Sequence, residues 1–370
     1  MDRTKGNRVL YLDAARFFAI LLVAFNHAVN RTWDNFNGVK EEFYRISTAS
    51  TVLKAVISVI SRFGVPLFLM ITGVLILNRR FATKEEFGRF FKHNWLPLLG
   101  ATELWFFLGF WFLVFVNPYN RLLENAGWGG TLWALLKTLL FVDQVRFDSM
   151  WYLPMILSIY LLLPILAVFL YRSPAAKVIL LPLAGVFLCD MLIPELNAFL
   201  PLFGGREITF FLYDMNFLSP YLIYVFAGWW IGNGGLRKLP DAAVVSGALL
   251  SCLLCCMLQF FLYSVSDHLL SYMSPGILVC AVFLFECLRR FADRPGKLSR
   301  PMSTVSRAAF ALYVLHVFFV SALNWYGDFG QWPHPLRLCF LWLAPLAASA
   351  LVIAALSKIP FCRKLLFLIK

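Results

Sequence analysis

The residues of this chain that are able to do chemistry begin with an arginine and a histidine in an apolar segment near the N-terminus. In YLDAARFFAILLVAFNHAVN, residues 11–30, Arg16 and His27 are eleven positions apart. On an α-helix this spacing places them on one face, about 16 Å apart along the axis. Asp13 lies three positions before Arg16, so we expect the two to pair and to offset part of the cost of burial. The alternative is a structural ion pair beside an interfacial histidine.

Other apolar segments also carry ionisable residues. SRFGVPLFLMITGVLIL contains Arg62 beside a Gly-x-Pro sequence, and SRAAFALYVLHVFF contains His316 with Tyr313 three positions before it on the same helical face. A further segment carries Glu286. Ionisable groups in membrane helices usually face a bundle interior or a water-filled cavity. Two histidines and two arginines therefore favour a functional cavity over isolated structural groups.

The composition indicates that membrane helices position these residues. The chain has 370 residues, of which 61% are hydrophobic and 14% charged, whereas soluble domains contain about 25% charged residues. We predict an all-α polytopic membrane protein with a single domain over residues 1–370 and ten transmembrane helices of near the usual spanning length. A shorter apolar run, 132–141, predicts an interfacial or re-entrant helix. The predicted spans are 9–29, 52–77, 95–116, 150–170, 177–193, 216–232, 241–263, 274–290, 305–323 and 337–357.

The net charge of +13 follows the predicted topology and does not indicate nucleic-acid binding. Most lysines and arginines fall in the N-terminal segment, the even-numbered loops and the C-terminal segment. The positive-inside rule then places both termini in the cytoplasm. With this orientation Arg16 is in the cytoplasmic half of the first helix, His27 is near its outer end, and His316 is in the middle of the membrane. We expect a multi-pass protein of the cell (inner, cytoplasmic) membrane that contacts anionic lipids.

Most of the eight cysteines lie within predicted helices, including CLLCC at Cys252, Cys255 and Cys256. A metal or redox cluster is one interpretation, and packing of small apolar side chains is the other. No histidine lies nearby at ligand spacing, and the spacing is not that of a zinc site. The sequence favours packing and predicts no metal.

Four segments of the chain, three of them quoted above, together resemble acyltransferase family 3, the integral-membrane O-acyltransferases. LDAARFFAILLVAFNHA resembles the Arg-x10-His signature of its first helix, and RFGVPLFLMITGVLIL resembles its second helix. WYLPMILSIYLLLPIL and SRAAFALYVLH resemble two later segments, and all four occur in the family's order across nearly the whole chain.

The resemblance implies an enzyme that transfers an acyl group across the membrane to a hydroxyl. The donor is expected to be acyl-CoA, most commonly acetyl-CoA, with succinyl as an alternative group. The acceptor is expected to be an envelope polysaccharide, a lipid-linked sugar or peptidoglycan. By the resemblance His27 is the catalytic base, Arg16 belongs to the acyl-CoA side and His316 matches a second family histidine. We group Asp13 with His27 and His316 as candidate catalytic residues.

Further site residues follow with less direct matches. The family often has an Arg-x-x-Arg pair before its third helix, and RFFKHNWLP offers Arg89 and Lys92 instead. These two residues and Arg62 are our candidates for holding the donor, and Arg62 or Tyr313 could also stabilise the oxyanion. The alternative for Arg89 and Lys92 is ordinary positive-inside charge. Tyr313 and Trp151 are the candidate substrate-binding residues.

Two other functional classes remain open. A proton-coupled transporter or flippase would also use buried charges and helices broken by Gly and Pro, although the two halves show no inverted repeat. A non-catalytic scaffold explains the topology but not the ordered motifs. We expect acceptor contacts in the outer loops 30–51 and 194–215, since loops often carry specificity. The sequence leaves the oligomeric state open and is compatible with a homo-oligomer.

Overall fold

The chain folds into helices, as expected for an all-α membrane protein. The computed structural model describes residues 9–32, 48–142, 150–172, 176–208, 219–265, 270–292, 296–329 and 331–369. Within these ranges no residue is in a β-strand, and eight helices are long and apolar enough to cross a membrane. The polytopic all-α class is confirmed. The eight helices are Leu10–Thr32, Val52–Ile76, Lys84–Val116, Tyr152–Tyr171, Leu180–Phe203, Asp241–Leu262, Ser299–Tyr326 and His334–Leu356.

Two of the ten predicted spans are shorter than a typical transmembrane helix. The segment 216–232 corresponds to α11 (Leu222–Gly232), which has 11 residues. The segment 274–290 corresponds to α13 (Pro275–Phe291), which has 17 residues. A bilayer is usually crossed by about 20 residues. The count of ten spans and the cytoplasmic location of the termini therefore stay predictions.

The chain divides into two compact units. The first unit comprises Met1–Asn26, Asn35–Arg80 and Ile165–Ser306, and the second comprises His27–Asp34, Phe81–Pro164 and Arg307–Lys370. The division falls inside three helices: α1 (Leu10–Thr32), α8 (Tyr152–Arg172) and α14 (Ser299–Tyr326).

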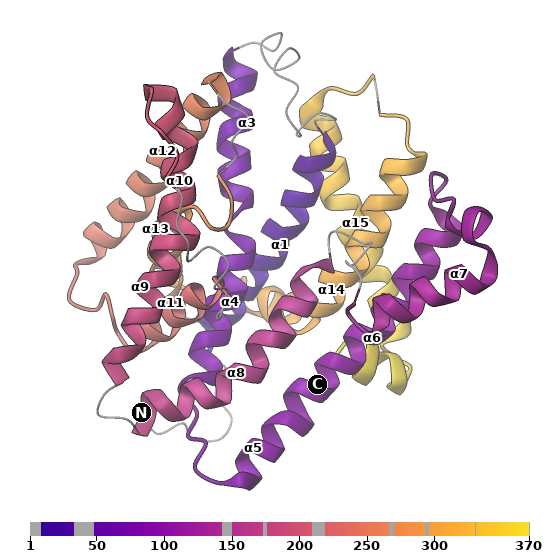
Figure 1. Ribbon diagram of the computed structural model, residues 1–370, viewed down its shortest axis with the longest axis horizontal. Helices are drawn as coiled ribbons and strands as arrows, with labels where there is room; N and C mark the ends of the chain where they lie inside the picture. The colour runs from indigo at the N-terminus through magenta and orange to yellow at the C-terminus, as the bar shows by residue number, and fades with distance from the viewer. Residues whose placement is uncertain are drawn as a thin grey trace. The chain divides into compact units, whose positions relative to one another are not determined.

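In the first unit, α3 (Thr48–Ser61) and α4 (Gly64–Ile76) are consecutive helices separated by two residues. α4 packs along α11 (Figure 1). The contact depends on glycine, because a Cβ at Gly73 would overlap the Val225 carbonyl and one at Gly228 would overlap the Met70 backbone. Small residues allow this close approach of backbones, which is common between membrane helices.

We predict that Gly73→Ala will lower the thermal unfolding midpoint of the detergent-solubilised protein. The added methyl group has no space, and overpacking of this kind costs about 1–3 kcal/mol. Gly88→Ala is the matched control, since nothing lies within 4 Å of a Cβ there and Ala is the better helix former by about 1 kcal/mol. Equal midpoints for the two variants would contradict the close approach of Gly73 to Val225.

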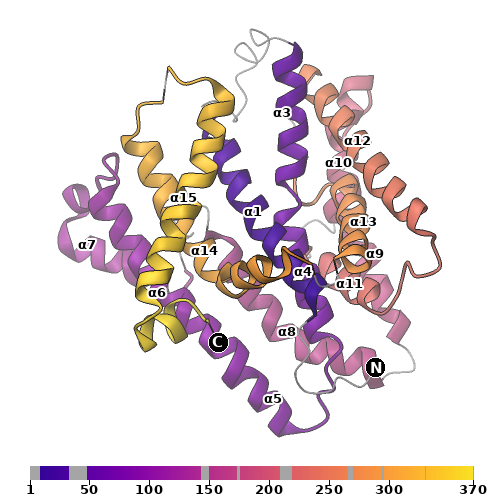
Figure 2. The ribbon, with the colours of Figure 1, turned by 180° about the vertical axis from the view of Figure 1, so that it is seen from behind.

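α12 (Asp241–Val265) packs along α13 in the same unit (Figure 2). An ion-pair network joins α12 and α13 at the end that contains Asp241. Glu286 is fully buried and accepts bonds of 2.6–2.7 Å from Arg289 and Arg290, and Arg290 also pairs with Asp241 at 2.6 Å. Glu286 is therefore compensated by two guanidinium groups and has a structural role. The thiols of Cys255 and Cys280 pack in the apolar core between the two helices, with Sγ atoms 3.8 Å apart.

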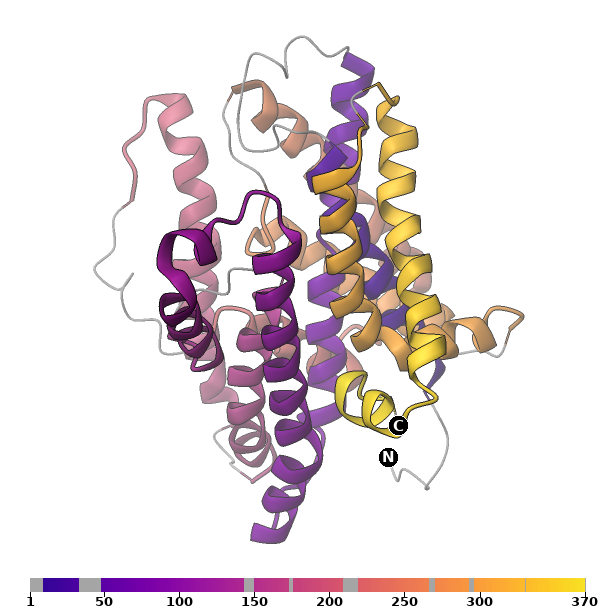
Figure 3. The ribbon, with the colours of Figure 1, turned by 90° about the vertical axis from the view of Figure 1, so that its right-hand side faces the viewer.

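The second unit contains a long helix formed by α5 (Lys84–Phe90), a π-helical turn (Phe91–Trp95) and α6 (Leu96–Val116). Thr83 and Glu86 form a capping box at its start. α7 (Leu122–Leu139) lies beside α6 (Figure 3). It contains most of the predicted short helix 132–141 but begins ten residues earlier, with a kink at Gly127, where φ is 60°.

The C-terminal part of the second unit is α15 (His334–Leu356), followed by a π-helical turn at Cys362–Leu366. Trp105 of α6 donates a hydrogen bond to the Leu366 carbonyl at 2.8 Å. This hydrogen bond joins the segment Cys362–Leu366 to α6, so this segment packs within the second unit.

Candidate active site

Two histidines that are far apart in the sequence lie side by side in the second unit. His27 is on α1 and His316 is on α14, and their ring centroids are 5.3 Å apart with planes inclined by 44°. The sequence placed the two histidines at different depths, and this adjacency corrects that expectation. α14 spans Ser299–Tyr326 rather than 305–323. The offset of one helix against another cannot be derived from sequence boundaries, which are uncertain by a few residues.

The contacts of His316 determine which ring nitrogen carries the hydrogen. The side chain is 1% exposed, and Nδ1 lies 2.8 Å from the carbonyl oxygen of Leu312. A carbonyl only accepts, so Nδ1 must donate and the lone pair of the neutral ring is at Nε2. Nε2 is buried and has no hydrogen-bond partner among the described residues. His316 therefore presents a proton-accepting nitrogen in the interior.

A row of aromatic rings leads to the two histidines. The Tyr313 ring lies 6.2 Å from that of His316 and 5.7 Å from that of Tyr152, and Tyr152 lies 6.2 Å from Trp151. Tyr313 and Trp151, the two expected substrate-binding residues, thus lie in the same row. Tyr152 is an addition, although it stands in the WYLP segment already singled out.

Arg31, which the sequence did not single out, lies next to His27, and a second such arginine, Arg337, contacts Arg31. Arg31, in the last turn of α1, donates to the His27 carbonyl and to the Ser321 hydroxyl, each at 3.3 Å. Arg337 of α15 donates to the Arg31 carbonyl at 2.9 Å. These bonds join α1, α14 and α15 around His27. The signal in the sequence was that Arg31 ends the first apolar segment and Arg337 lies at the start of the last one. Arginines at such positions are also typical of the charge that sets membrane topology.

Asp13 lies in the first unit, where serines of α14 hold it. Its side chain is buried and accepts hydrogen bonds of 2.7 Å from Ser303 and from Ser306. The expected contact with Arg16 is longer, at 3.5 Å, and the Arg16 side chain is 28% exposed. Asp13 precedes His27 by 14 positions, about 21 Å along the helix. Its contacts favour a positioning role over contact with the reacting atoms.

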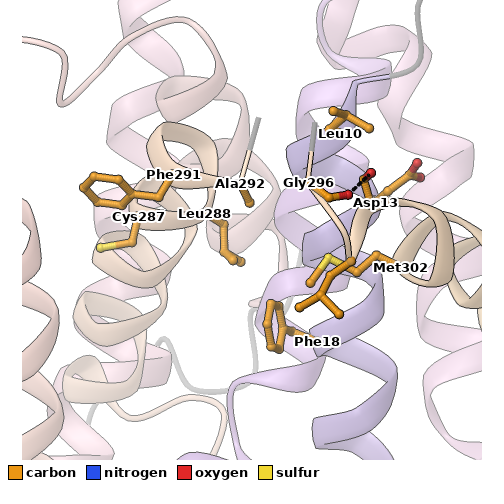
Figure 4. Close-up of a pocket in the computed structure, with 11 residues that line it drawn as sticks. Leu10, Asp13, Phe18, Cys287, Leu288, Phe291, Ala292, Gly296 and Met302 are labelled. Atoms are coloured by element: carbon orange, nitrogen blue, oxygen red, sulfur yellow. Dashed lines mark hydrogen bonds between the residues drawn. The ribbon is translucent and has the colours of Figure 1, made fainter. Parts of the chain in front are cut away.

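A cavity of about 380 Å³ opens beside Asp13 in the first unit. Figure 4 shows Asp13 and Phe18 of α1 on one side and Leu288 and Phe291 of α13 on the other, with Met302 of α14 nearby. The lining residues are mostly apolar, and Asp13 and Ser299 are the most polar of them. Such a cavity suits an apolar chain with a polar end.

The chain was also compared with known protein families. A family model described as an acyltransferase domain, that of acyltransferase family 3, matches residues 9–357. The chain belongs to this family. No curated protein and no solved structure matched the chain.

The donor-side residues expected in this acyltransferase are divided between the two units. Arg16 and Arg62 belong to the first unit, whereas Arg89 and Lys92 belong to the second. Arg89 is in the last turn of α5 and Lys92 in the π-helical turn, and both are exposed. Arg62 lies between α3 and α4 and contacts Tyr272. Of the expected acceptor loops, residues 33–47 of the first and 209–215 of the second lie outside the described residues, whereas residues 194–203 of the second are helical.

Proposed function

We propose that this protein is a transmembrane O-acyltransferase that acts on envelope material. It moves an acyl group, expected to be acetyl, from cytoplasmic acyl-CoA to a hydroxyl of an extracytoplasmic glycan, a lipid-linked sugar or peptidoglycan. Membership of the acyltransferase family supports acyl transfer. The observation that carries the proposal is the contact between His27 and His316, since acyl transfer to an alcohol needs a positioned base.

The chemistry follows from the two imidazoles. The acceptor oxygen attacks the thioester carbonyl carbon, a carbon–oxygen bond forms, and the carbon–sulfur bond to CoA breaks. His27 takes the hydroxyl proton, which finally passes to the CoA thiolate, so charge is balanced. His316 supports this step because its Nε2 can accept a proton or a hydrogen bond. Arg31 holds the His27 carbonyl and so restrains the end of α1 that carries the base.

The donor is proposed to bind through the first part of α1. Arg16 can pair with a CoA phosphate, and the apolar cavity beside Asp13 can take part of the pantetheine arm. Asp13, held by Ser303 and Ser306, fixes this part of α1 against α14. Arg89 and Lys92 are exposed cations that can attract the negatively charged donor from solution.

The acceptor is proposed to bind at the aromatic row in the second unit. Tyr152 and Tyr313 form an edge-to-face pair, and Trp151 follows them. Aromatic rings combine an apolar face with a polar group, which suits a sugar. The proposed location is the cell membrane, with both termini in the cytoplasm.

The test uses purified protein in lipid nanodiscs with radiolabelled acetyl-CoA. CoA release is measured with and without an extract of envelope glycans. Release that depends on the extract, with label recovered in the glycan, would support the proposal. Acetyl-CoA that does not bind at all would contradict it and would favour the transporter.

A further inference from the structure

Arg62 is a charged residue inside the first unit, and no carboxylate of the described residues pairs with it. It lies at the junction of α3 and α4, near the middle of the apolar segment Val52–Ile76. The guanidinium Nε is buried and has no hydrogen-bond partner, and Arg62 takes part in no ion pair within the described part of the chain. Its side-chain contact there is the ring of Tyr272, 5.3 Å from the guanidinium carbon.

Other arginines of the same unit are compensated or exposed. Arg289 and Arg290 share Glu286, and Arg16 has Asp13 within 3.5 Å. Arg80 also lies over a tyrosine ring, that of Tyr171 at 4.7 Å, but both of these residues are exposed. A charge at membrane depth is costly, and a cation–π contact returns only about 0.5–2 kcal/mol. The positive charge of Arg62 is therefore only partly compensated, and an anion bound beside it would be stabilised.

Hydrogen bonds hold Tyr272 in a fixed position beside Arg62. Asn26 donates to the Tyr272 hydroxyl at 3.2 Å and accepts from Ser61 at 3.0 Å. Tyr224, which is fully buried, donates to the Tyr272 carbonyl. Tyr272 is thereby fixed through both its side chain and its backbone. Asn26 and Ser61 are themselves buried, at 5% and 1% exposure.

We infer that Arg62 and Tyr272 form a binding site for an oxyanion, a carboxylate or phosphate, carried by the acceptor. This inference rests on the proposed acyltransferase function. A guanidinium binds either group through two parallel hydrogen bonds, and the fixed tyrosine ring offers a face for the attached sugar. Tyr272 lies between α12 and α13, in a connection that the topology prediction places outside the cell. CoA phosphates are cytoplasmic, so the acceptor is the proposed source of the anion.

The acceptor class that follows is an acidic one. Glycans that carry a uronate and lipid-linked sugars that carry a phosphate or pyrophosphate both have the required group. Neutral polysaccharide would leave the Arg62 charge uncompensated.

The experiment measures thermal unfolding in nanodiscs without any acyl donor. Glucuronate, inorganic pyrophosphate and CoA are titrated separately against wild type, Arg62→Gln and Arg80→Gln. We expect glucuronate or pyrophosphate to raise the midpoint of wild type and of Arg80→Gln, and to leave Arg62→Gln unchanged. Whichever of the two ligands acts identifies the source of the oxyanion. Arg62→Lys keeps the charge but loses the paired donors, so we expect at least tenfold weaker binding.

Three results would overturn the inference. The first is that neither glucuronate nor pyrophosphate raises the unfolding midpoint of wild type. The second is that Arg62→Gln shows the same rise as wild type. The third is that only CoA raises the midpoint and that Arg62→Gln abolishes this rise. Arg62→Gln without ligand is expected to unfold no earlier than wild type, because it removes an uncompensated charge. Since no acyl donor is present, failure here is separate from failure of the CoA-release assay.

Discussion

Replacement of His27 by glutamine is expected to lower acetyl transfer by about 10²–10⁴-fold, the contribution of a positioned general base. Glutamine keeps a polar side chain of similar length but cannot take the hydroxyl proton. The measurement is CoA release in nanodiscs with saturating acetyl-CoA and acceptor. Donor binding should be unchanged, because His27 is eleven residues from Arg16 on α1.

The histidine pair also makes a prediction about His316. If the two rings act together, His27→Gln and His316→Gln combined should cost little more than the worse single variant, since residues that act as a unit are non-additive. His334→Gln is the control, because His334 is exposed at the start of α15. Turnover of His27→Gln within threefold of wild type would exclude His27 as the base. Fully additive losses of turnover would show that the two histidines act independently.

Replacement of Asp13 by alanine is expected to destabilise the protein by about 1–3 kcal/mol, because it removes the acceptor of two hydrogen bonds in the interior. The carboxylate is buried and accepts from two serine hydroxyls, so the variant removes both of these hydrogen bonds. The thermal unfolding midpoint in detergent measures the effect. Asp241→Asn is the matched control, since Asp241 is 67% exposed and exposed pairs contribute about 0–1 kcal/mol.

Kinetics separate a positioning role of Asp13 from a catalytic one. A positioning residue at the cavity should mainly raise KM for acetyl-CoA, and the double variant Ser303→Ala, Ser306→Ala should reproduce this change. A catalytic Asp13 would instead lose kcat while the serine variant kept it. That second pattern would contradict the role assigned from the contacts.

Several features of the fold were predictable from local sequence. A bilayer demands about 20 apolar residues per crossing, so hydropathy indicated a polytopic protein and predicted ten spans, of which the described helices long and apolar enough to cross a membrane number eight. The helical period is also local, so Arg16 and His27 can be placed on one helix from their spacing. The four ordered motifs indicated the family, and the match over residues 9–357 confirms it.

The pairing expected between Asp13 and Arg16 shows the limit of such reasoning. Positions three apart on a helix are always near each other, but the structure gives Asp13 shorter bonds to Ser303 and Ser306. Those serines are about 290 positions away in the sequence. Local spacing cannot include competitors that another helix provides.

Sequence alone therefore determined the membrane class, the family and the residue types available for acyl transfer. Only the tertiary structure decided which of them meet: His27 with His316, Arg31 with Arg337, and Arg62 with Tyr272. The physical reason is that hydropathy and helical period act along one chain segment, whereas neighbours are selected by packing. Close packing of α4 on α11 at Gly73 and Gly228, for example, depends on the shapes of both helices together.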